Sequence, residues 1–290
     1  MENEEIEKQK EFNQKQEMYR HSMAHVLAKA IKELYPNVKL AIGPAIENGF
    51  YYDFDNLTIN QEDFAKIEDK MKEIIARNED FVRSEVTRKQ ALEMFKNEPY
   101  KTELINDLPE DSIISVYHTG SDFYDLCRGP HVENTKFLRG FSFKINRASG
   151  AYWRGSEKNK MLTRVYVYGF LNKDDLKECL RLEQEARERD HRKIGKDLGI
   201  FMFNELVGRG LPIWLPKGFT LRRELSDYIM NKEIALGYQH VMTPSLGNIN
   251  LYKTSGHWDH YQECMFPAMK VEDEGYVLRP MNCPHHMVIY

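Results

Sequence analysis

The most regular pattern in the chain is a helical stripe of apolar positions near its N-terminus. Between residues 18 and 35 these positions recur at spacings of three and four, which predicts one amphipathic helix that ends before Pro36. The stripe consists of Met23, Val26, Leu27, Ala30, Ile31 and Leu34. Residues 1–17 are mostly charged or polar, so we expect them to form a disordered tail.

Two further helix starts are marked by polar residues. Asn60 is expected to cap a helix whose apolar face consists of Phe64, Ile67, Met71, Ile74 and Ile75. Thr87 and Gln90 have the spacing of a capping box, which predicts another helix from residue 88. Short strands are expected at residues 50–54 and 81–86.

From residue 112 to residue 170 the pattern changes to short β-type runs separated by turn residues, as in an antiparallel sheet. Asn172 then starts a charged helix. Six basic and five acidic residues lie between Arg181 and Asp197, a mixture typical of an exposed helix that joins two domains. Beyond it we expect a helix up to Ala235, a strand at 238–243 and a helix near Pro284.

These elements predict an α+β fold with two domains. We divide the chain into a charged tail at 1–17, a first domain with an antiparallel sheet at 18–171, a linker helix at 172–198 and the N-terminal part of a second domain at 199–290. About 90 residues is little for a domain with an open sheet, so we expect the second domain to be incomplete.

Composition narrows the protein class. The 290 residues are 41% hydrophobic and 30% charged, which fits a globular protein and excludes a disordered or collagen-like chain. No run approaches the roughly 18 apolar residues of a spanning helix, and no signal peptide is visible, so a cytoplasmic protein without a membrane partner is expected. The four cysteines form no Cys-x-x-Cys pair, which argues against a disulfide framework.

The net charge of −4 hides a basic segment. Eight basic residues and one acid, Glu157, lie between Lys136 and Arg164, a local balance of +7, and aromatic residues are interleaved with them. Such a segment suits a phosphate backbone and unstacked bases, and it equally suits a solvated face of a sheet.

His21 and His25 are four residues apart, about 40° from each other on one helical face and on the side opposite the apolar stripe. The pair must therefore face solvent, a cleft or a second layer. Because Ser22 stands where a metalloprotease of the His-Glu-x-x-His type has glutamate, that chemistry is excluded.

A second group of reactive residues follows about 100 positions later. Gly129-Pro130 forms a turn between Cys127 and His131, so the thiol and the imidazole can converge. With His21 and His25 they would supply three nitrogens and one sulfur, which suits tetrahedral zinc. The same residues equally fit a metal-free acid–base cluster in which Asp125 orients an imidazole, or structural residues that share no site.

Six motifs in order resemble those of bacterial threonyl-tRNA synthetases. They are His-Ser-Met-Ala-His at 21–25, Ala-Ile-Gly-Pro at 41–44, Asn-Gly-Phe-Tyr-Tyr-Asp at 48–53, Cys-Arg-Gly-Pro-His at 127–131, Gly-Ala-Tyr-Trp-Arg-Gly at 150–155 and His-Arg-Lys-Ile-Gly-Lys at 191–196. The histidine and cysteine motifs also resemble the second additional domain that alanyl-tRNA synthetases share. The resemblance runs from about residue 18 to the end of the chain.

The resemblance implies an editing domain at 18–171, which hydrolyses threonine tRNA mischarged with serine, followed by the start of a class II aminoacyl-tRNA synthetase catalytic domain. Serine lacks one methyl group, a difference worth only about 1–3 kcal/mol in a pocket, so a second site must remove the error. The implied editing residues are His21, His25, Cys127 and His131, with Lys101 and Asp125 as polar contacts. Members of this family are described as editing without a metal, which favours a water positioned by imidazole. The basic segment would meet the acceptor end of the tRNA.

In the second domain, Gly237 to Pro244 resembles motif 1, which builds a dimer interface, and Cys283 resembles the first ligand of a catalytic zinc that selects threonine. His285 stands where relatives often have glycine. The resemblance also implies ATP and magnesium, a homodimer, and two histidine zinc ligands outside this chain. We therefore expect a fragment of a threonine–tRNA ligase that edits but cannot activate threonine. The alternatives are a free-standing trans-editing deacylase and a non-catalytic tRNA-binding module.

Overall fold

The computed structural model describes residues 2–290, with side chains from residue 6 onward. The chain forms two compact units, Met1–Arg189 and Asp190–Tyr290, which are described separately here. Helices and antiparallel sheets occur in both, which confirms the predicted α+β class. None of the helices in the described part of the chain has the length and apolar character needed to cross a bilayer.

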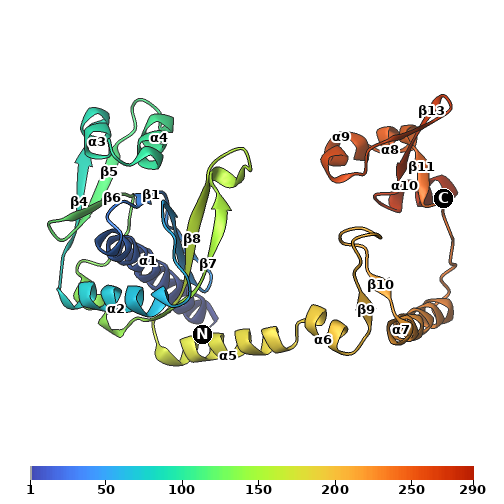
Figure 1. Cartoon of the computed structure of the whole chain (residues 1–290), viewed down its shortest axis with the longest axis horizontal. Coiled ribbons are helices and arrows are strands. Elements are labelled where there is room, and N and C mark those ends of the chain that lie inside the picture. Colours follow the sequence, from blue (N-terminus) through green and yellow to red (C-terminus); the bar gives the residue numbers. More distant parts are fainter. Residues whose placement is uncertain (1) are drawn as a thin grey trace. The chain divides into compact units, whose positions relative to one another are not determined.

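The first unit contains two antiparallel sheets (Figure 1). The larger has the order β1-β3-β8-β7, with β2 paired to β3. Its strands are β1 Lys39–Leu40, β2 Ala45–Ile46, β3 Gly49–Asp55, β7 Ser142–Tyr152 and β8 Met161–Phe170. The smaller has the order β4-β5-β6 and consists of β4 Phe81–Val86, β5 Ile114–Thr119 and β6 Phe123–Leu126.

Helix α1, Glu2–Leu34, is the centre of this unit. It packs against α2, Asp63–Ala76, and across β3, and most of its residues from Arg20 to Ile31 are buried on every side. The other elements of the unit are α3 Arg88–Met94, α4 Pro99–Asp107, α5 Lys173–Glu188, η1 Thr135–Gly140 and η2 Trp153–Gly155. A helix buried on both sides explains why the histidine pair lies opposite the apolar stripe: that side faces a second layer.

The predicted disordered tail is wrong for the described residues, because 2–17 continue α1. Glutamate, lysine and glutamine are good helix formers, and the buried part of α1 supplies the costly nucleus from which they extend. The predicted cap at Asn60 is also displaced: α2 begins at Asp63, and the Asn60 side chain instead accepts the Glu62 N–H at 2.8 Å in the turn before it. The capping box of Thr87 and Gln90 is confirmed.

The charged helix α5 is capped by Asn172, as expected, but it ends at Glu188. Asp190 caps a separate helix, α6 His191–Asp197, so residues 172–198 form two helices rather than one. A side-chain acceptor at Asp190, which bonds the Arg192 N–H at 2.8 Å, ends one helix and starts the next.

The second unit contains the ribbon β9 Phe201–Met202 with β10 Ile213–Trp214, and a sheet of order β11-β13-β12. Its other elements are α7 Pro216–Ala235, β11 Leu246–Asn248, α8 Ile249–Thr254, α9 His257–Tyr261, η3 Gln262–Cys264, β12 Met269–Val271, β13 Glu274–Leu278 and α10 Cys283–Ile289. The strand predicted at 238–243 is absent from the described structure, because this segment pairs with no other strand there and a strand needs a partner.

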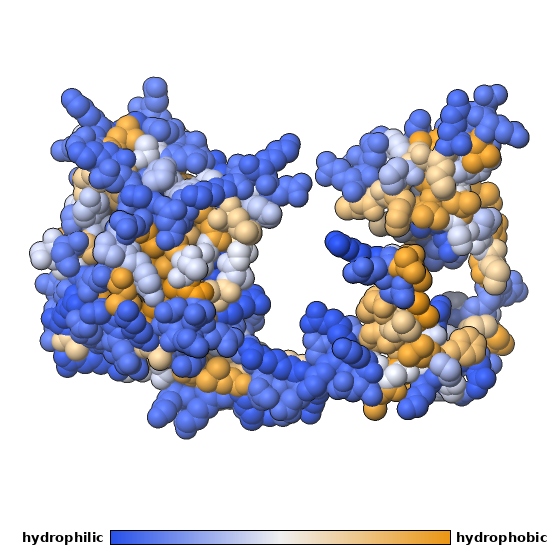
Figure 2. All heavy atoms as spheres, viewed as in Figure 1, coloured by the Kyte–Doolittle hydropathy of each residue, from blue (hydrophilic) through white to orange (hydrophobic). Residues whose placement is uncertain are grey.

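Large apolar side chains are exposed along α7, among them Phe219, Leu225 and Tyr228, each at least 60% exposed. Hydrophobic atoms are visible on the surface of this unit in Figure 2. Few side chains of the unit are fully buried, in contrast to the first unit.

Candidate functional site

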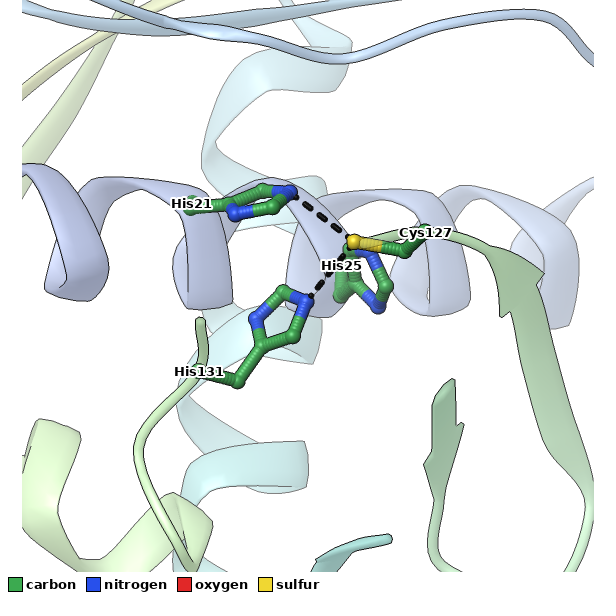
Figure 3. A group of neighbouring side chains, drawn as sticks. All are labelled: His21, His25, Cys127 and His131. Atoms are coloured by element: carbon green, nitrogen blue, oxygen red, sulfur yellow. Dashed lines mark hydrogen bonds between the residues drawn. The ribbon is translucent and has the colours of Figure 1, made fainter. Parts of the chain in front are cut away.

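Four side chains predicted to meet lie together in the first unit (Figure 3). His21 and His25 lie on α1, and Cys127 and His131 lie in the loop that follows β6. One nitrogen or sulfur from each lies within 4.8 Å of those of all the others. The convergence depends on α1 packing against the loop, since more than 100 residues separate the two pairs.

The sulfur of Cys127 is the centre of the group. It lies 3.2 Å from Nε2 of His21 and 3.1 Å from Nε2 of His131, and it accepts the Gly129 N–H at 3.2 Å. Burial raises the pKa of this thiol to about 11. At pH 7 roughly one molecule in 10⁴ would therefore carry a thiolate.

The three imidazoles are neutral at pH 7. Burial lowers the pKa of His21 and of His131, and it lowers the pKa of His25 well below the ordinary value. His131 also stacks on Phe81, with ring centroids 5.2 Å apart. Nδ1 of His25 is buried and has no hydrogen-bond partner within the described residues.

Asp125 on β6 and Lys101 on α4 form a buried ion pair beside this group. The carboxylate also accepts the Tyr52 hydroxyl at 2.5 Å and the Leu126 N–H at 2.7 Å. Nε2 of His25 is 3.9 Å from Asp125, too far for a hydrogen bond. The expectation that Asp125 orients an imidazole is therefore wrong in this structure: the carboxylate holds Lys101 and Tyr52 instead.

These side chains line one cavity of about 360 Å³. Its polar wall consists of His21, His25, Tyr52, Lys101, Ser115, Asp125, Cys127 and Arg128, and its apolar wall includes Ile42, Leu104, Leu108 and Ile113. His131 is not in the lining and lies behind Cys127. The cavity therefore combines two cationic side chains, Lys101 and Arg128, with two neutral imidazoles in a partly apolar enclosure.

The sequence analysis missed two residues of the site. Tyr52 is 1% exposed and shares the inward face of β3 with Phe50 and Phe54, so its alternation marked it as an ordinary core residue. In the sequence, Ser22 only excludes a metalloprotease, whereas in the structure its hydroxyl lies 3.1 Å from Nδ1 of His131. Neither role leaves a signal in spacing alone.

The four ligand atoms suit zinc in kind, as three imidazole nitrogens and one sulfur. The orphaned Nδ1 of His25 is another feature that a ligand would satisfy. The sulfur–nitrogen distances of 3.1 and 3.2 Å, however, are hydrogen-bond distances. Tetrahedral zinc, with bonds of about 2.3 Å to sulfur and 2.0 Å to nitrogen, would hold these atoms roughly 3.5 Å apart.

Cys283 lies at the start of α10 in the second unit, where it is exposed. Within residues 6–290, the structure gathers no set of three candidate metal ligands around it. The neighbouring His285 instead contacts the hydroxyl of Tyr252 at 3.5 Å.

Half of the basic side chains in the segment from residue 136 to residue 164 are neutralised by acids from elsewhere. Their ion pairs are Lys144–Glu68, Arg154–Glu103, Lys160–Asp55 and Arg164–Asp53. Arg147 lies over the ring of Tyr166 at 4.5 Å. The segment therefore offers much less free positive charge than its local balance of +7 suggests.

Comparison with known proteins places these residues in context. Residues 114–166 match the family model described as "Threonyl and Alanyl tRNA synthetase second additional domain". A threonine–tRNA ligase of Anoxybacillus flavithermus is 56% identical over 277 residues, which is 94% of this chain and 43% of that protein. A threonine–tRNA ligase of Staphylococcus epidermidis is 56% identical over 276 residues, 94% of this chain and 42% of that protein.

The chain thus spans about two fifths of the length of these curated relatives. A solved structure titled as the RNA-binding domain of threonyl-tRNA synthetase from Cryptosporidium parvum Iowa II is 42% identical over 35% of this chain and 25% of that chain, with a TM-score of 0.34.

Proposed function

We propose that this chain carries an editing site that hydrolyses threonine tRNA mischarged with serine. The chain is homologous to bacterial threonine–tRNA ligases over 94% of its length. The observation that supports this most directly is the cavity in which the ammonium of Lys101 and the neutral imidazole of His21 lie in one wall. An ester hydrolase needs both a proton acceptor for water and a positive group near the carbonyl oxygen.

In the reaction we propose, water attacks the carbonyl carbon of the seryl ester while the imidazole of His21 accepts its proton. The pKa of His21 lies below the ordinary value, so the ring is neutral and able to act as a base at pH 7. The C–O bond to the ribose then breaks, and the imidazolium returns the proton to the departing ribose oxygen. The products are serine and the free tRNA.

Lys101 would stabilise the negative charge that develops on the carbonyl oxygen. Asp125 and Tyr52 fix its position, because the carboxylate pairs with Lys101 and accepts the Tyr52 hydroxyl at 2.5 Å. Cys127 is a wall residue rather than the nucleophile in this proposal, since its pKa of about 11 leaves the thiol protonated.

We propose that the editing site works without a metal, with a water positioned by the imidazoles. In this version the Cys127 sulfur makes hydrogen bonds to the rings of His21 and His131. Should zinc bind, His21, His25, Cys127 and His131 would hold it and it would supply a Lewis acid.

For the longer protein we propose a cytoplasmic threonine–tRNA ligase that uses ATP and magnesium, with threonine and the acceptor end of threonine tRNA as substrates. Cys283 would be one ligand of a zinc that selects threonine, and the exposed apolar side chains of α7 would contribute to a homodimer. A trans-editing deacylase and a non-catalytic tRNA-binding module remain the rival hypotheses. The homology of residues beyond 190 to the ligases disfavours the first rival.

The test is deacylation by the full 290-residue chain, added in excess to threonine tRNA charged with serine. Release of serine is expected, with release of threonine from correctly charged tRNA at least tenfold slower. Asp125→Asn should slow serine release at least a hundredfold, because it frees the ammonium of Lys101 from its fixed position.

Asp53→Asn is the matched control, because Asp53 is an equally buried carboxylate whose ion pair with Arg164 lies outside the cavity. Binding of the tRNA without release of serine would favour the non-catalytic module. Equal loss of activity in both variants would show that the effect of Asp125→Asn is one of stability.

A further inference from the structure

Ser22 links the histidine helix to the loop of Cys127 and His131. Its side chain is completely buried, on α1 between His21 and Met23. Its hydroxyl oxygen lies 2.8 Å from the Met18 carbonyl, 3.0 Å from the Val132 N–H and 3.1 Å from Nδ1 of His131.

The donors and acceptors around the Ser22 hydroxyl determine which nitrogen of His131 carries hydrogen. The Met18 carbonyl can only accept and the Val132 N–H can only donate, so the single hydroxyl hydrogen goes to Met18 and one lone pair accepts from Val132. The remaining lone pair faces Nδ1, which must then carry hydrogen. Donation from Ser22 to the ring instead would give up the shorter bond, 2.8 Å, for the longer one, 3.1 Å.

A hydrogen on Nδ1 leaves Nε2 of the neutral ring as a lone pair, and Nε2 is the atom 3.1 Å from the sulfur of Cys127. The protonated thiol can therefore donate its hydrogen to His131. The sulfur then has a lone pair free for the Gly129 N–H, 3.2 Å away.

We propose that Ser22 is a positioning residue of the editing reaction: it holds His131 as the Nδ1–H tautomer, and His131 in turn directs the Cys127 thiol hydrogen away from the cavity. The kinetic part of this inference rests on the proposed hydrolysis, whereas the tautomer does not. Ser22 does not line the cavity, so it acts only through His131, which lies behind the wall, and Cys127, which lies in it.

A purely structural hydroxyl would make similar backbone bonds, and Thr135 provides that comparison. Its side chain is also completely buried, donates to the Ile75 carbonyl at 3.2 Å and accepts the Glu79 N–H at 2.9 Å. It contacts no histidine. Thr135→Ala therefore removes the same kind of backbone hydrogen bonds as Ser22→Ala and leaves the site untouched.

The decisive measurement is the tautomer of His131 in the full chain with ¹⁵N-labelled histidine, read from long-range ¹⁵N–¹H correlations and assigned with His131→Asn. The parent chain is expected to show a protonated Nδ1 and an unprotonated Nε2. Ser22→Ala should shift the ring toward the Nε2–H form, and Thr135→Ala should not. A parent ring protonated at Nε2, or a tautomer that is the same in Ser22→Ala, overturns the proposal; the parent spectrum decides even if Ser22→Ala does not fold.

Deacylation of seryl-tRNA gives the kinetic test. Ser22→Ala should lower kcat at least tenfold with KM changed less than twofold. This loss would be part of the roughly 10²–10⁴-fold rate increase that positioned acid–base groups contribute. Ser22→Thr, which keeps the hydroxyl, should recover most of the loss, and Thr135→Ala should keep the parent kcat. A chain that never releases serine refutes the proposed function, while the spectrum still tests Ser22. An unchanged kcat in Ser22→Ala refutes the positioning role.

Discussion

The sulfur of Cys127 lies 3.2 Å from Nε2 of His21, although 106 positions separate the two residues in the chain. The contact exists because α1 is buried between two layers, so that its second face meets the loop after β6. It places a thiol that burial keeps protonated, with a pKa of about 11, at the back of the cavity.

The protonated state of Cys127 predicts slow alkylation. With iodoacetamide at pH 7.5, we expect Cys264, which is exposed, to be modified at least a hundredfold faster than Cys127. The rate at Cys127 should still rise with pH up to at least pH 9. Peptide mass spectrometry after timed quenching measures both rates, and comparable rates at pH 7.5 would contradict the raised pKa.

The lowered pKa values of the histidines predict acid sensitivity of the first unit. Because the folded pKa values of His25 and His131 lie below the 6.5 of the unfolded chain, the unfolded chain binds more protons below pH 6.5. Above pH 6.5 these two imidazoles should leave the free energy of unfolding unchanged. Below pH 6.5 each of them should lower it by about 1.4 kcal/mol for every pH unit of acidification.

Hydrogen exchange of the amides of residues 20–31 at several pH values, corrected for the intrinsic rate, measures this slope. His25→Asn should make the slope of this free energy against pH smaller by the contribution of one imidazole. A free energy that does not change between pH 7 and pH 5 would contradict neutral, buried rings.

The buried ammonium of Lys29 predicts a large loss of stability on its removal. It is 1% exposed and bonds Glu79 at 2.7 Å, Asp122 at 2.6 Å and the Thr119 carbonyl at 3.0 Å. Lys29→Met should lower the free energy of unfolding by about 2–4 kcal/mol, because it leaves Glu79 and the carbonyl without their partner.

Lys72→Met is the control, because its ion pair with Asp69 is mostly exposed and should contribute less than about 0.5 kcal/mol. Urea unfolding followed by Trp153 fluorescence, with Trp214 and Trp258 replaced by phenylalanine, reports on the first unit alone. Similar losses in the two variants would refute the structural role of Lys29.

The close approach of Gly43 to Tyr52 predicts an effect on catalysis. A Cβ atom at Gly43 would lie 2.1 Å from Cδ2 of Tyr52, so Gly43→Ala must displace the ring that donates to Asp125. We expect kcat/KM for serine release to fall about tenfold or more. Gly140→Ala, where a Cβ meets nothing within 4 Å, should keep the parent value; equal values for both variants would remove Tyr52 from the mechanism.

The metal-free proposal predicts that the purified chain, dialysed without a strong chelator, contains much less than one zinc per molecule in elemental analysis. One zinc per chain that is lost in Cys127→Ala and kept in Cys283→Ala would refute it. That result would assign the metal to the histidine cluster rather than to the second unit.

Sequence patterns predicted the parts of the site that depend on local geometry. The spacing of His21 and His25 gave one helical face, and the turn at Gly129-Pro130 brought Cys127 near His131. Their convergence came from family resemblance, because no local pattern specifies which loop packs against α1. Tyr52 was missed for the same reason: its hydroxyl finds Asp125 only after β3 and β6 are packed.

Charge shows most clearly what a linear sequence conceals. The basic segment from residue 136 has almost no acids among its neighbours in sequence, yet four of its eight basic side chains pair with Asp53, Asp55, Glu68 and Glu103. Pairing of β3 with β8 brings in the acids of β3, and packing of the helices against the sheet brings in those of α2 and α4. Counting charges along the chain therefore overstates the positive field of a folded sheet.

Every residue that lines the cavity falls between positions 21 and 128, inside one compact unit. A graft of the first unit onto another protein would therefore transfer the complete lining of the cavity without any residue from positions 190–290.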